Sequence, residues 1–241
     1  MVEFSKSNKI PVSFSWSGGK DSAFALWQLQ KDQRYEVVRL HTTLGEQTQQ
    51  VGMHGTSVDL IEAQANAIGL PLDKIFYRAS GDNQAYEKAV NSYLDILEKM
   101  GIRHLAYGDI FLEDLRKYRE DKLAERGFEA LFPLWASDTE VLSKNFIEAG
   151  FKTSICAADA DLISKEWVGK DFDFTFLKSL STQVDPCGEN GEFHSFCYAG
   201  PIFSHSLVVK LQEVISQTYE IPLENGEKDK KMYWFADLWI S

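Results

Sequence analysis

The chain has 241 residues, of which 44% are hydrophobic and 25% are charged, a composition typical of a soluble globular protein with one large domain or two small ones. It carries 25 Lys and Arg against 36 Asp and Glu, so the formal net charge is −11. That charge argues against broad binding to nucleic acid or to an anionic membrane, although it permits one local phosphate site. No apolar run approaches the ~18 residues of a membrane span.

Cysteine usage indicates the compartment. The chain has three cysteines, Cys156, Cys187 and Cys197, which cannot all pair with one another. The first eleven residues contain no apolar stretch of the length that a secretory signal needs. An odd cysteine count in this setting predicts a reducing, cytoplasmic location.

The first half of the chain alternates strand and helix patterns. Strands are expected at Ile10–Trp16, Glu36–Thr43, Leu72–Tyr77 and Arg103–Tyr107, and helices at Ala23–Gln30, Ser57–Ile68, Gln84–Met100 and Leu112–Arg126. This alternation predicts right-handed βαβ units and a parallel sheet. Ligands of such sheets bind beyond the carboxyl ends of the strands, where Ser15–Ser22, Thr42-Thr43 and Gly108-Asp109 would converge.

The pattern changes after Pro133-Leu134-Trp135. The second half is expected to contain a helix at Thr139–Ala149, a strand at Lys152–Ala157, a charged helical stretch, a polar segment at Val184–Ser195 and strands at Ser206–Tyr219 and Lys231–Trp239. We therefore predict two domains, 1–135 and a smaller α+β domain over 136–241, which pack tightly because no Gly/Ser linker joins them. The last strands either complete a sheet or pair with a second subunit, so a homodimer is an open alternative.

A glycine turn, Ser17-Gly18-Gly19-Lys20-Asp21-Ser22, follows the first predicted strand and opens a helix. A phosphate there would meet backbone N–H groups, the positive end of the helix dipole and the charge of Lys20. Asp21 repels phosphate, but its carboxylate suits Mg²⁺. The Walker A pattern is excluded because Phe14 and Asp21 occupy positions that require Gly and Ser/Thr. The alternative is a strand-to-helix turn that simply needs glycines.

A second polar constellation runs from Asp185 to His194. Its Gly188 and Gly191 make a tight loop feasible, and Glu189, Glu192 and His194 could face one cleft. Such carboxylates could position ammonium and take a proton from it. Three alternatives stay open: a solvated surface turn, a zinc site built from cysteines and His194, and a Cys187–His194 nucleophile pair.

These motifs carry a family resemblance. The SGGKDS turn resembles the PP-loop of the ATP pyrophosphatase superfamily, whose fold is adenine nucleotide alpha hydrolase-like. Further motifs follow in order: Gly52-Met53-His54-Gly55, Gly108-Asp109-Ile110, Pro133-Leu134-Trp135 and the DPCGENGEFHSF run of 185–196. Together they resemble the diphthine–ammonia ligase (diphthamide synthase) family, and the chain looks like a bacterial-type member of it. The resemblance implies an N-terminal PP-loop ATP-binding domain and a C-terminal acceptor domain that carries the GENGE segment.

The resemblance also implies a reaction. A carboxylate oxygen of the acceptor attacks the α-phosphate of ATP, and ammonia then displaces AMP to form an amide. The expected activity is therefore that of an ATP-dependent carbon–nitrogen ligase that releases AMP and pyrophosphate. The family's characterised acceptor is diphthine on elongation factor 2, and a corrinoid-related metabolite is the alternative for a bacterial-type member. A tRNA-modifying PP-loop enzyme and a non-catalytic ATP-binding sensor are the competing hypotheses.

Residue roles follow from the motifs and the resemblance. The expected ATP-binding residues are Ser15, Ser17, Gly18, Gly19, Lys20, Asp21, Ser22, His41, Thr42, Gly108 and Asp109, with Asp21 and Asp109 also holding Mg²⁺. The expected catalytic residues are Lys20, Asp21, Glu189, Glu192 and His194, and the expected acceptor-binding residues are His54, Arg119, Asn190 and Gly191. Each has a structural alternative: a strand histidine for His41, a loop tip for His54, a helix cap for Asp109 and helix ion pairs for Arg116 and Arg119.

Overall fold

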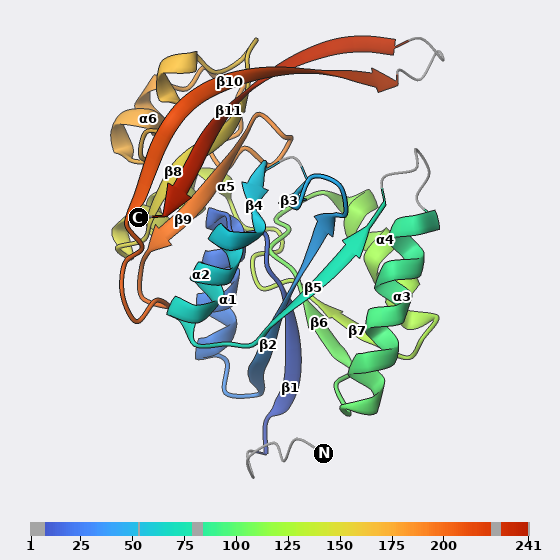
Figure 1. Cartoon of the computed structure of the whole chain (residues 1–241). Coiled ribbons are helices and arrows are strands. Elements are labelled where there is room, and N and C mark those ends of the chain that lie inside the picture. The colour runs from blue at the N-terminus through green and yellow to red at the C-terminus, as the bar shows by residue number, and fades with distance from the viewer. Residues whose placement is uncertain (1–7, 53, 79–83, 223–227, 241) are drawn as a thin grey trace.

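The computed structural model describes residues 8–52, 54–78, 84–222 and 228–240 (Figure 1). Its N-terminal part is built on a five-stranded sheet of order β5-β2-β1-β6-β7, in which every neighbouring pair is parallel. The strands are β1 (Ile10–Ser15), β2 (Tyr35–Gly45), β5 (Leu72–Tyr77), β6 (His104–Ala106) and β7 (Glu129–Leu131). The predicted parallel α/β architecture is confirmed. The sequence pattern did not predict β7, because a strand of three residues, one exposed and two half-buried, is too short to give a strand signal.

Helices cover both faces of this sheet. They are α1 (Lys20–Lys31), α2 (Val58–Ile68), α3 (Gln84–Lys99) and α4 (Glu113–Ala124). In Figure 1, α1 and α2 lie on one side of the strands and α3 and α4 on the other. α1 buries residues almost all round, such as Phe24 and Leu26, because the C-terminal part covers the side that the sheet leaves free. α3 and α4 form a separate core with the strands through Leu94, Leu97 and Leu123.

The C-terminal part contains an antiparallel sheet of order β10-β11-β8-β9. Its elements are α5 (Thr139–Glu148), β8 (Lys152–Asp159), the 3₁₀ helix η1 (Lys165–Trp167), α6 (Phe174–Ser179), β9 (Phe193–Ala199), β10 (Val209–Pro222) and β11 (Lys228–Ile240). β9 begins at Phe193, within the last three residues of the expected polar segment Val184–Ser195, and the sequence did not predict this strand. Both faces of β9 are largely buried, so it lacks the alternation that marks a half-buried strand.

The two parts share one continuous hydrophobic core. Phe24 of α1 packs edge-on against Phe146 of α5, with ring centroids 5.8 Å apart, and against Phe151 at the same distance. Trp135 lies in the connection between β7 and α5. The domain boundary at residue 135 stays a prediction.

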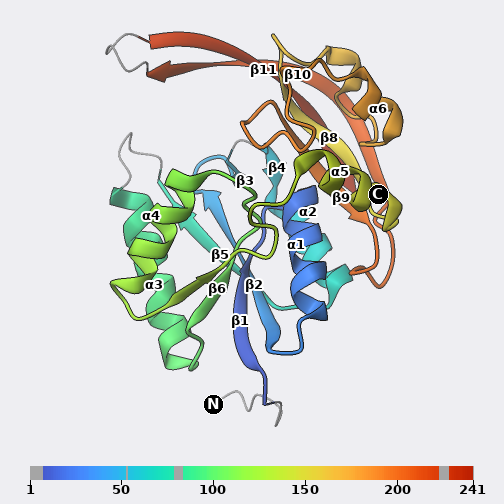
Figure 2. The ribbon, with the colours of Figure 1, turned by 180° about the vertical axis from the view of Figure 1, so that it is seen from behind.

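The β10–β11 hairpin, residues 209–222 and 228–240, forms a long arm. Only Tyr233–Phe235 of β11 pair with β8, so the rest of the hairpin extends beyond the sheet. Figures 1 and 2 show the arm arching over the edge at which β1, β2 and β5 end. Below it, β3 (Gln50–Val51) and β4 (Thr56–Ser57) form a small antiparallel two-stranded ribbon on either side of His54.

None of the helices in the described part of the chain combines the length and apolar character that a bilayer crossing demands.

Candidate functional site

The glycine turn joins the end of β1 to the start of α1. Gly18 has φ +82°, and a Cβ on it would lie 2.7 Å from the Oε1 atom of Gln64, so both backbone conformation and space require glycine. Gly19 is the N-cap of α1 and, having no side chain, makes no side-chain cap hydrogen bond. The positive end of α1 favours an anion there, and the phosphate site itself stays a prediction.

Strand β9 and helix α2 hold this turn in place. The Cys197 backbone N–H donates to the Gly18 carbonyl oxygen at 2.8 Å, and the Lys20 backbone N–H donates to the Ser195 Oγ at 3.1 Å. The Gln64 side-chain amide donates to the Gly18 carbonyl at 2.9 Å and accepts from the Trp16 indole at 2.9 Å. The glycine turn is thus shaped by both parts of the chain.

Sequence reasoning missed Gln64, Ser195 and Cys197. A signal existed for Gln64, because it falls on the apolar face of its helix, four residues after Leu60 and three after Ile61. A polar side chain at a core position needs a buried hydrogen-bond partner. Ser195 and Cys197 gave no such signal, since their partners are backbone groups about 175 residues away in sequence.

Lys20 is the central cation of the site. Its side chain is only 4% exposed, and its ammonium donates to both Asp21 carboxylate oxygens, at 2.9 and 2.7 Å, and to the Cys187 carbonyl. Burial by itself lowers the pKa of Lys20, but the Asp21 carboxylate outweighs it and raises that pKa above its ordinary value. Lys20 therefore stays charged, and it links the glycine turn to the 185–194 segment.

A cavity of about 450 Å³ opens in front of the turn. The predicted site residues that line it are Ser15, Ser17, Lys20, Asp21, Ser22, His54, Gly108, Asp109, Arg119, Glu189, Gly191 and His194. Leu115, Gly188, Phe193 and Ser195 complete the wall. The volume is of the size that small-molecule sites have in proteins. The structure thus brings the glycine turn, the β6 end and the second constellation to one space.

Three carboxylates face this cavity. Burial raises the pKa of Asp21 and of Asp109, although Lys20 and Arg119 respectively oppose the shift. Burial also raises the pKa of Glu189 to about 7, against the hydrogen bond of 2.7 Å that its Oε1 accepts from the Ile110 backbone N–H. A carboxyl group that titrates near neutral pH is suited to proton transfer.

Two histidine rings lie against each other in the wall, tilted by 38°. The rings of His54 and His194 lie 4.5 Å apart between centroids. Burial, followed by the charge of Lys20, lowers the pKa of His54 to about 4, and burial also lowers that of His194 well below its ordinary value. Both rings are neutral at physiological pH. The His54 Nδ1 is buried and has no hydrogen-bond partner among the described residues, which leaves it for a ligand. Met53, its neighbour in the motif, lies outside the described residues.

Arg119 and Arg116 separate into different roles. Arg119 lines the cavity, pairs with Asp109 and lies 4.2 Å above the Tyr107 ring. Arg116 pairs with Glu120 at 2.7 Å and stacks 4.5 Å from the Trp135 ring, away from the cavity lining. Only Arg119 is placed to reach a ligand.

Other predicted residues lie behind the wall. His41 is buried, its Nδ1 lies 2.8 Å from the Ser13 Oγ, and its carbonyl accepts from the Trp16 N–H at 2.7 Å. Burial lowers its pKa to about 3. Thr42 is also buried, and neither residue lines the cavity. Their role in ATP binding stays a prediction.

Glu192 and Glu189 differ sharply in surroundings. Glu192 is 4% exposed and accepts from the backbone N–H groups of Asp185 (2.9 Å) and Asn190 (3.0 Å) and from the Asn190 side chain (3.1 Å). It is outside the cavity lining and holds the loop closed on itself, with Gly191 in the left-handed region at φ +86°. This geometry gives Glu192 and Asn190 a structural part in the loop.

The cysteines are buried and free. The Cys187 thiol donates to the Thr139 carbonyl at 3.4 Å, and burial raises its pKa. Within the described ranges no group of three or more His, Cys, Asp or Glu side chains could hold a metal ion. The structure therefore supports neither the zinc alternative nor the nucleophile pair.

The comparisons with known proteins agree with these motifs. Residues 11–129 match the family model of the diphthamide synthase N-terminal domain, and residues 138–234 match that of the diphthamide synthase C-terminal domain. The chain is 28% identical over 223 residues to diphthine–ammonia ligase of Homo sapiens, covering 83% of this chain and 82% of that protein. It is 26% identical over 226 residues to the Bos taurus protein of the same name, with 84% of each covered.

Two further likenesses are more limited. The diphthine–ammonia ligase of Schizosaccharomyces pombe is 25% identical over 221 residues, which are 84% of this chain but 36% of that protein, so the chain spans about a third of its length. The U34-tRNA thiolase NcsA from Methanococcus maripaludis, solved with its [4Fe-4S] cluster, superposes with a TM-score of 0.35 at 17% identity over 60% of this chain and 59% of that one. The two domain matches cover most of the chain, and in the expected order. The chain therefore belongs to the diphthamide synthase family.

Proposed function

We propose that this protein is an ATP-dependent ligase that adenylylates a carboxylate acceptor and converts it to an amide with ammonia, releasing AMP and pyrophosphate. The observation that carries the proposal is the shared cavity, into which the phosphate turn and the 185–194 segment converge around Lys20. Family membership supports the same chemistry, since the relatives are named diphthine–ammonia ligases. The acceptor is a carboxylate on a protein, such as diphthine, or on a small molecule such as a corrinoid-related metabolite.

The first step is attack on ATP. The β- and γ-phosphates bind the Ser17–Ser22 turn and the N-terminus of α1, and Lys20 turns from the Cys187 carbonyl to the phosphates. An acceptor carboxylate oxygen attacks the α-phosphorus, the bond to the bridging oxygen breaks, and pyrophosphate leaves with the electron pair. Lys20 and Arg119 stabilise charge that develops on the leaving group.

Asp21 and Asp109 fit Mg²⁺. Both carboxylates line the cavity, and their mutual repulsion contributes to the raised pKa of Asp109, which a divalent cation would relieve. Mg²⁺ is commonly held by one or two carboxylates together with substrate phosphates, so a set of two is sufficient. When bound, the ion supplies neutralisation of phosphate charge.

The second step is amide formation. Ammonia attacks the acyl carbon of the adenylylated acceptor, AMP leaves, and the nitrogen loses a proton. Glu189 is the carboxylate suited to accept it, because it lines the cavity and its pKa is raised to about 7. His54 and His194 stay neutral and bind the acceptor or the nucleotide through their ring nitrogens.

The test is an acceptor screen with α-labelled ATP, Mg²⁺ and ammonium, in which AMP is separated from ADP. The acceptors are elongation factor 2 carrying diphthine, a deproteinised small-molecule extract, and bulk tRNA. AMP formed with ammonium and either of the first two, together with a product lighter by about one mass unit as OH becomes NH₂, supports the ligase. AMP formed only with tRNA would contradict the ligase proposal and indicate a tRNA-modifying enzyme. ATP binding without any turnover would indicate a non-catalytic sensor.

The three buried, unpaired cysteines support a reducing compartment, and we place the protein in the cytoplasm.

A further inference from the structure

A second, smaller cavity lies between the arm and the ribbon formed by β3 and β4. Its volume is about 110 Å³, comparable to the ~150 Å³ apolar cavity that accommodates a benzene ring. On the arm side it is lined by Gln217, Tyr219, Phe235 and Asp237, and on the ribbon side by His54 and Thr56. The first cavity contains the glycine turn, and His54 lines both spaces.

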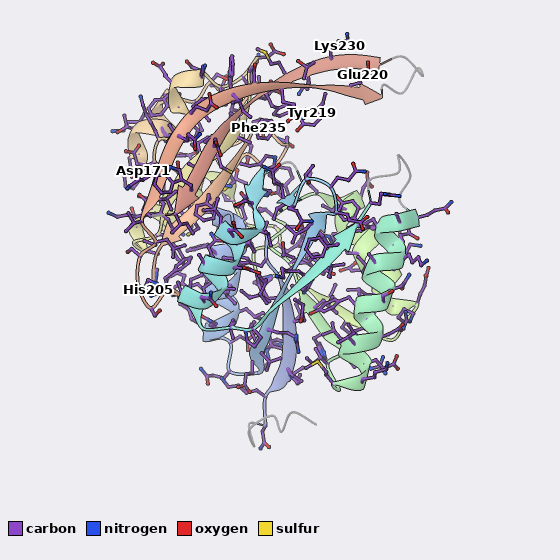
Figure 3. All side chains as sticks on the ribbon, in the orientation of Figure 1. Asp171, His205, Tyr219, Glu220, Lys230 and Phe235 are labelled. Carbon is purple, nitrogen blue, oxygen red and sulfur yellow. The ribbon has the colours of Figure 1, made fainter. Side chains whose placement is uncertain are left out.

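The arm presents one face to this cavity. Ile215, Gln217 and Tyr219 alternate along β10, and cross-strand pairing sets Ile215 opposite Phe235. Figure 3 shows Tyr219 on the underside of the arm, which faces the α/β part, and Lys230 on the upper side. The ring centroids of Tyr219 and Phe235 lie 6.2 Å apart, so two neighbouring aromatic rings line the cavity on the arm side.

The ribbon is fitted against the arm at Gly55. This residue has φ +63°, and a Cβ on it would lie 2.8 Å from the Phe235 ring. The close approach sets His54 at the junction between the two cavities. Its Nδ1 is buried and has no partner in the described part of the chain, whereas an unsatisfied buried nitrogen is rare unless a ligand completes it.

The two cavities differ in the cations that line them. Lys20 and Arg119 line the first cavity, beside the carboxylates of Asp21, Asp109 and Glu189. The residues that line the second include Asp237 and neither lysine nor arginine. The second cavity therefore disfavours phosphate and suits an apolar or aromatic group with a neutral or positively charged polar end.

We propose that this arm cavity binds the body of the acceptor, while the acceptor's carboxylate passes His54 to reach the phosphate turn. That the ligand is the acceptor rests on the proposed function, whereas the chemical class of the ligand follows from the cavity lining alone. The arm thereby selects acceptors that carry a carboxylate at one end and an apolar, neutral or cationic group at the other.

The first test needs no acceptor. Saturation-transfer NMR on the full chain uses three phenyl probes: phenethylamine, 2-phenylethanol and phenyl phosphate. We expect signals from the first two that fall about tenfold in Gln217→Trp, which fills the cavity, and persist in Thr218→Trp, which places the same ring on the opposite face. No phenethylamine signal in the wild type, or a signal that Gln217→Trp leaves unchanged, would overturn the proposal.

The second test uses the acceptor that forms AMP in the screen above. Gln217→Trp should raise the KM for that acceptor about tenfold and change the KM for ATP less than about twofold, and Thr218→Trp should change neither. An unchanged acceptor KM in Gln217→Trp overturns the acceptor assignment. If the wild type forms no AMP with any acceptor while the NMR pattern holds, the proposed function fails and the ligand site stands.

Discussion

At the scale of single residues, Lys20 is the side chain on which the proposed chemistry depends most. It is buried, stays charged because Asp21 is adjacent, and reaches across to the Cys187 carbonyl. Its ammonium already lies where the two parts of the chain meet. A phosphate that replaces the Cys187 carbonyl would offer a stronger, charged acceptor.

The variant Lys20→Gln should lower AMP formation by about 100-fold or more, because one preorganised donor to the developing charge is lost. Radiometric turnover measures this, and calorimetry with a non-hydrolysable ATP analogue measures binding. Lys31→Gln is the matched control, since Lys31 lies at the exposed end of the same helix. Equal turnover in Lys20→Gln and wild type would remove Lys20 from the mechanism.

Glu189 gives a prediction on stability as well as on activity. Burial raises its folded-state pKa from 4.5 to about 7. Its stabilising contribution is therefore fully present below pH 4.5 and is lost as pH rises through about 7. Glu189→Gln cannot ionise, so we expect its Tm to exceed that of the wild type by about 3 °C at pH 8.5 and to match it at pH 4.

The same variant should slow ammonium-dependent AMP release by about 100-fold, because the proton acceptor is gone. Glu192→Gln is the contrasting control. Its carboxylate accepts three N–H bonds within its loop, so the amide should lower the Tm at pH 8.5 instead of raising it. A lower Tm for Glu189→Gln at pH 8.5 would show that the Glu189 carboxylate stabilises the fold.

At the scale of elements, β9 and α2 hold the glycine turn in addition to the hydrogen bonds among its own residues, such as that from the Ser22 hydroxyl to the Gly19 carbonyl. Gln64 joins them: it donates to the Gly18 carbonyl and accepts from the Trp16 indole. It is completely buried. Removing it leaves a buried carbonyl and a buried indole N–H without this partner.

Gln64→Ala should therefore lower the free energy of unfolding by about 2–4 kcal/mol, the cost of stranded buried polar groups plus a small cavity. It should also weaken binding of the ATP analogue by about tenfold, because the turn loses a constraint on its geometry. Urea unfolding and calorimetry measure the two effects. Gln33→Ala, an exposed substitution just beyond α1, should change neither, and a Gln64→Ala protein that binds ATP as wild type does would place the rigidity of the turn elsewhere.

Some elements were open to prediction from the sequence and others were not. Leu72–Tyr77 has the predicted bounds, and α1 starts three residues earlier than the hydrophobic pattern suggests because Lys20 and Asp21 are polar residues in a helix start. The sequence pattern did not predict β9, because its burial depends on the glycine turn and the neighbouring sheet, both distant in sequence. It did not predict the ribbon β3–β4 either, because strands of two residues are too short to show the alternation of apolar and polar residues.

At the scale of the whole molecule, three of the five histidines have a lowered pKa: His41 is buried, and His54 and His194 are half-buried in the cavity wall. Burial lowers the pKa of His41 to about 3 and that of His54 to about 4, and it lowers that of His194 well below the ordinary value. The unfolded chain takes up protons at these residues near pH 6.5, whereas the folded chain does not. Their contribution to stability is thus present above about pH 6.5 and is lost as pH falls through their folded-state values.

Urea unfolding between pH 7 and pH 5 should show stability that falls with acidity by up to about 1.4 kcal/mol per pH unit for each such histidine. In His41→Asn one proton fewer is taken up on unfolding, so the pH dependence of the free energy of unfolding should be shallower by up to about 1.4 kcal/mol per pH unit. His205→Asn is the control, because His205 is exposed. Identical slopes in His41→Asn and wild type would contradict the buried, neutral state of His41.

The sequence by itself determined the fold class, the glycine turn between the first strand and helix, and the family, because these reside in contiguous motifs and in the local alternation of strand and helix. Only the tertiary structure decided which polar residues of the second constellation face the cavity: Glu189 does, and Glu192 turns into its own loop. It also decided that β9 grips the turn and that the arm overhangs it. The contact of Glu189 with Ile110 joins residues 79 positions apart, and that of Ser195 with Lys20 joins residues 175 positions apart. Local periodicity carries no information about such distant contacts.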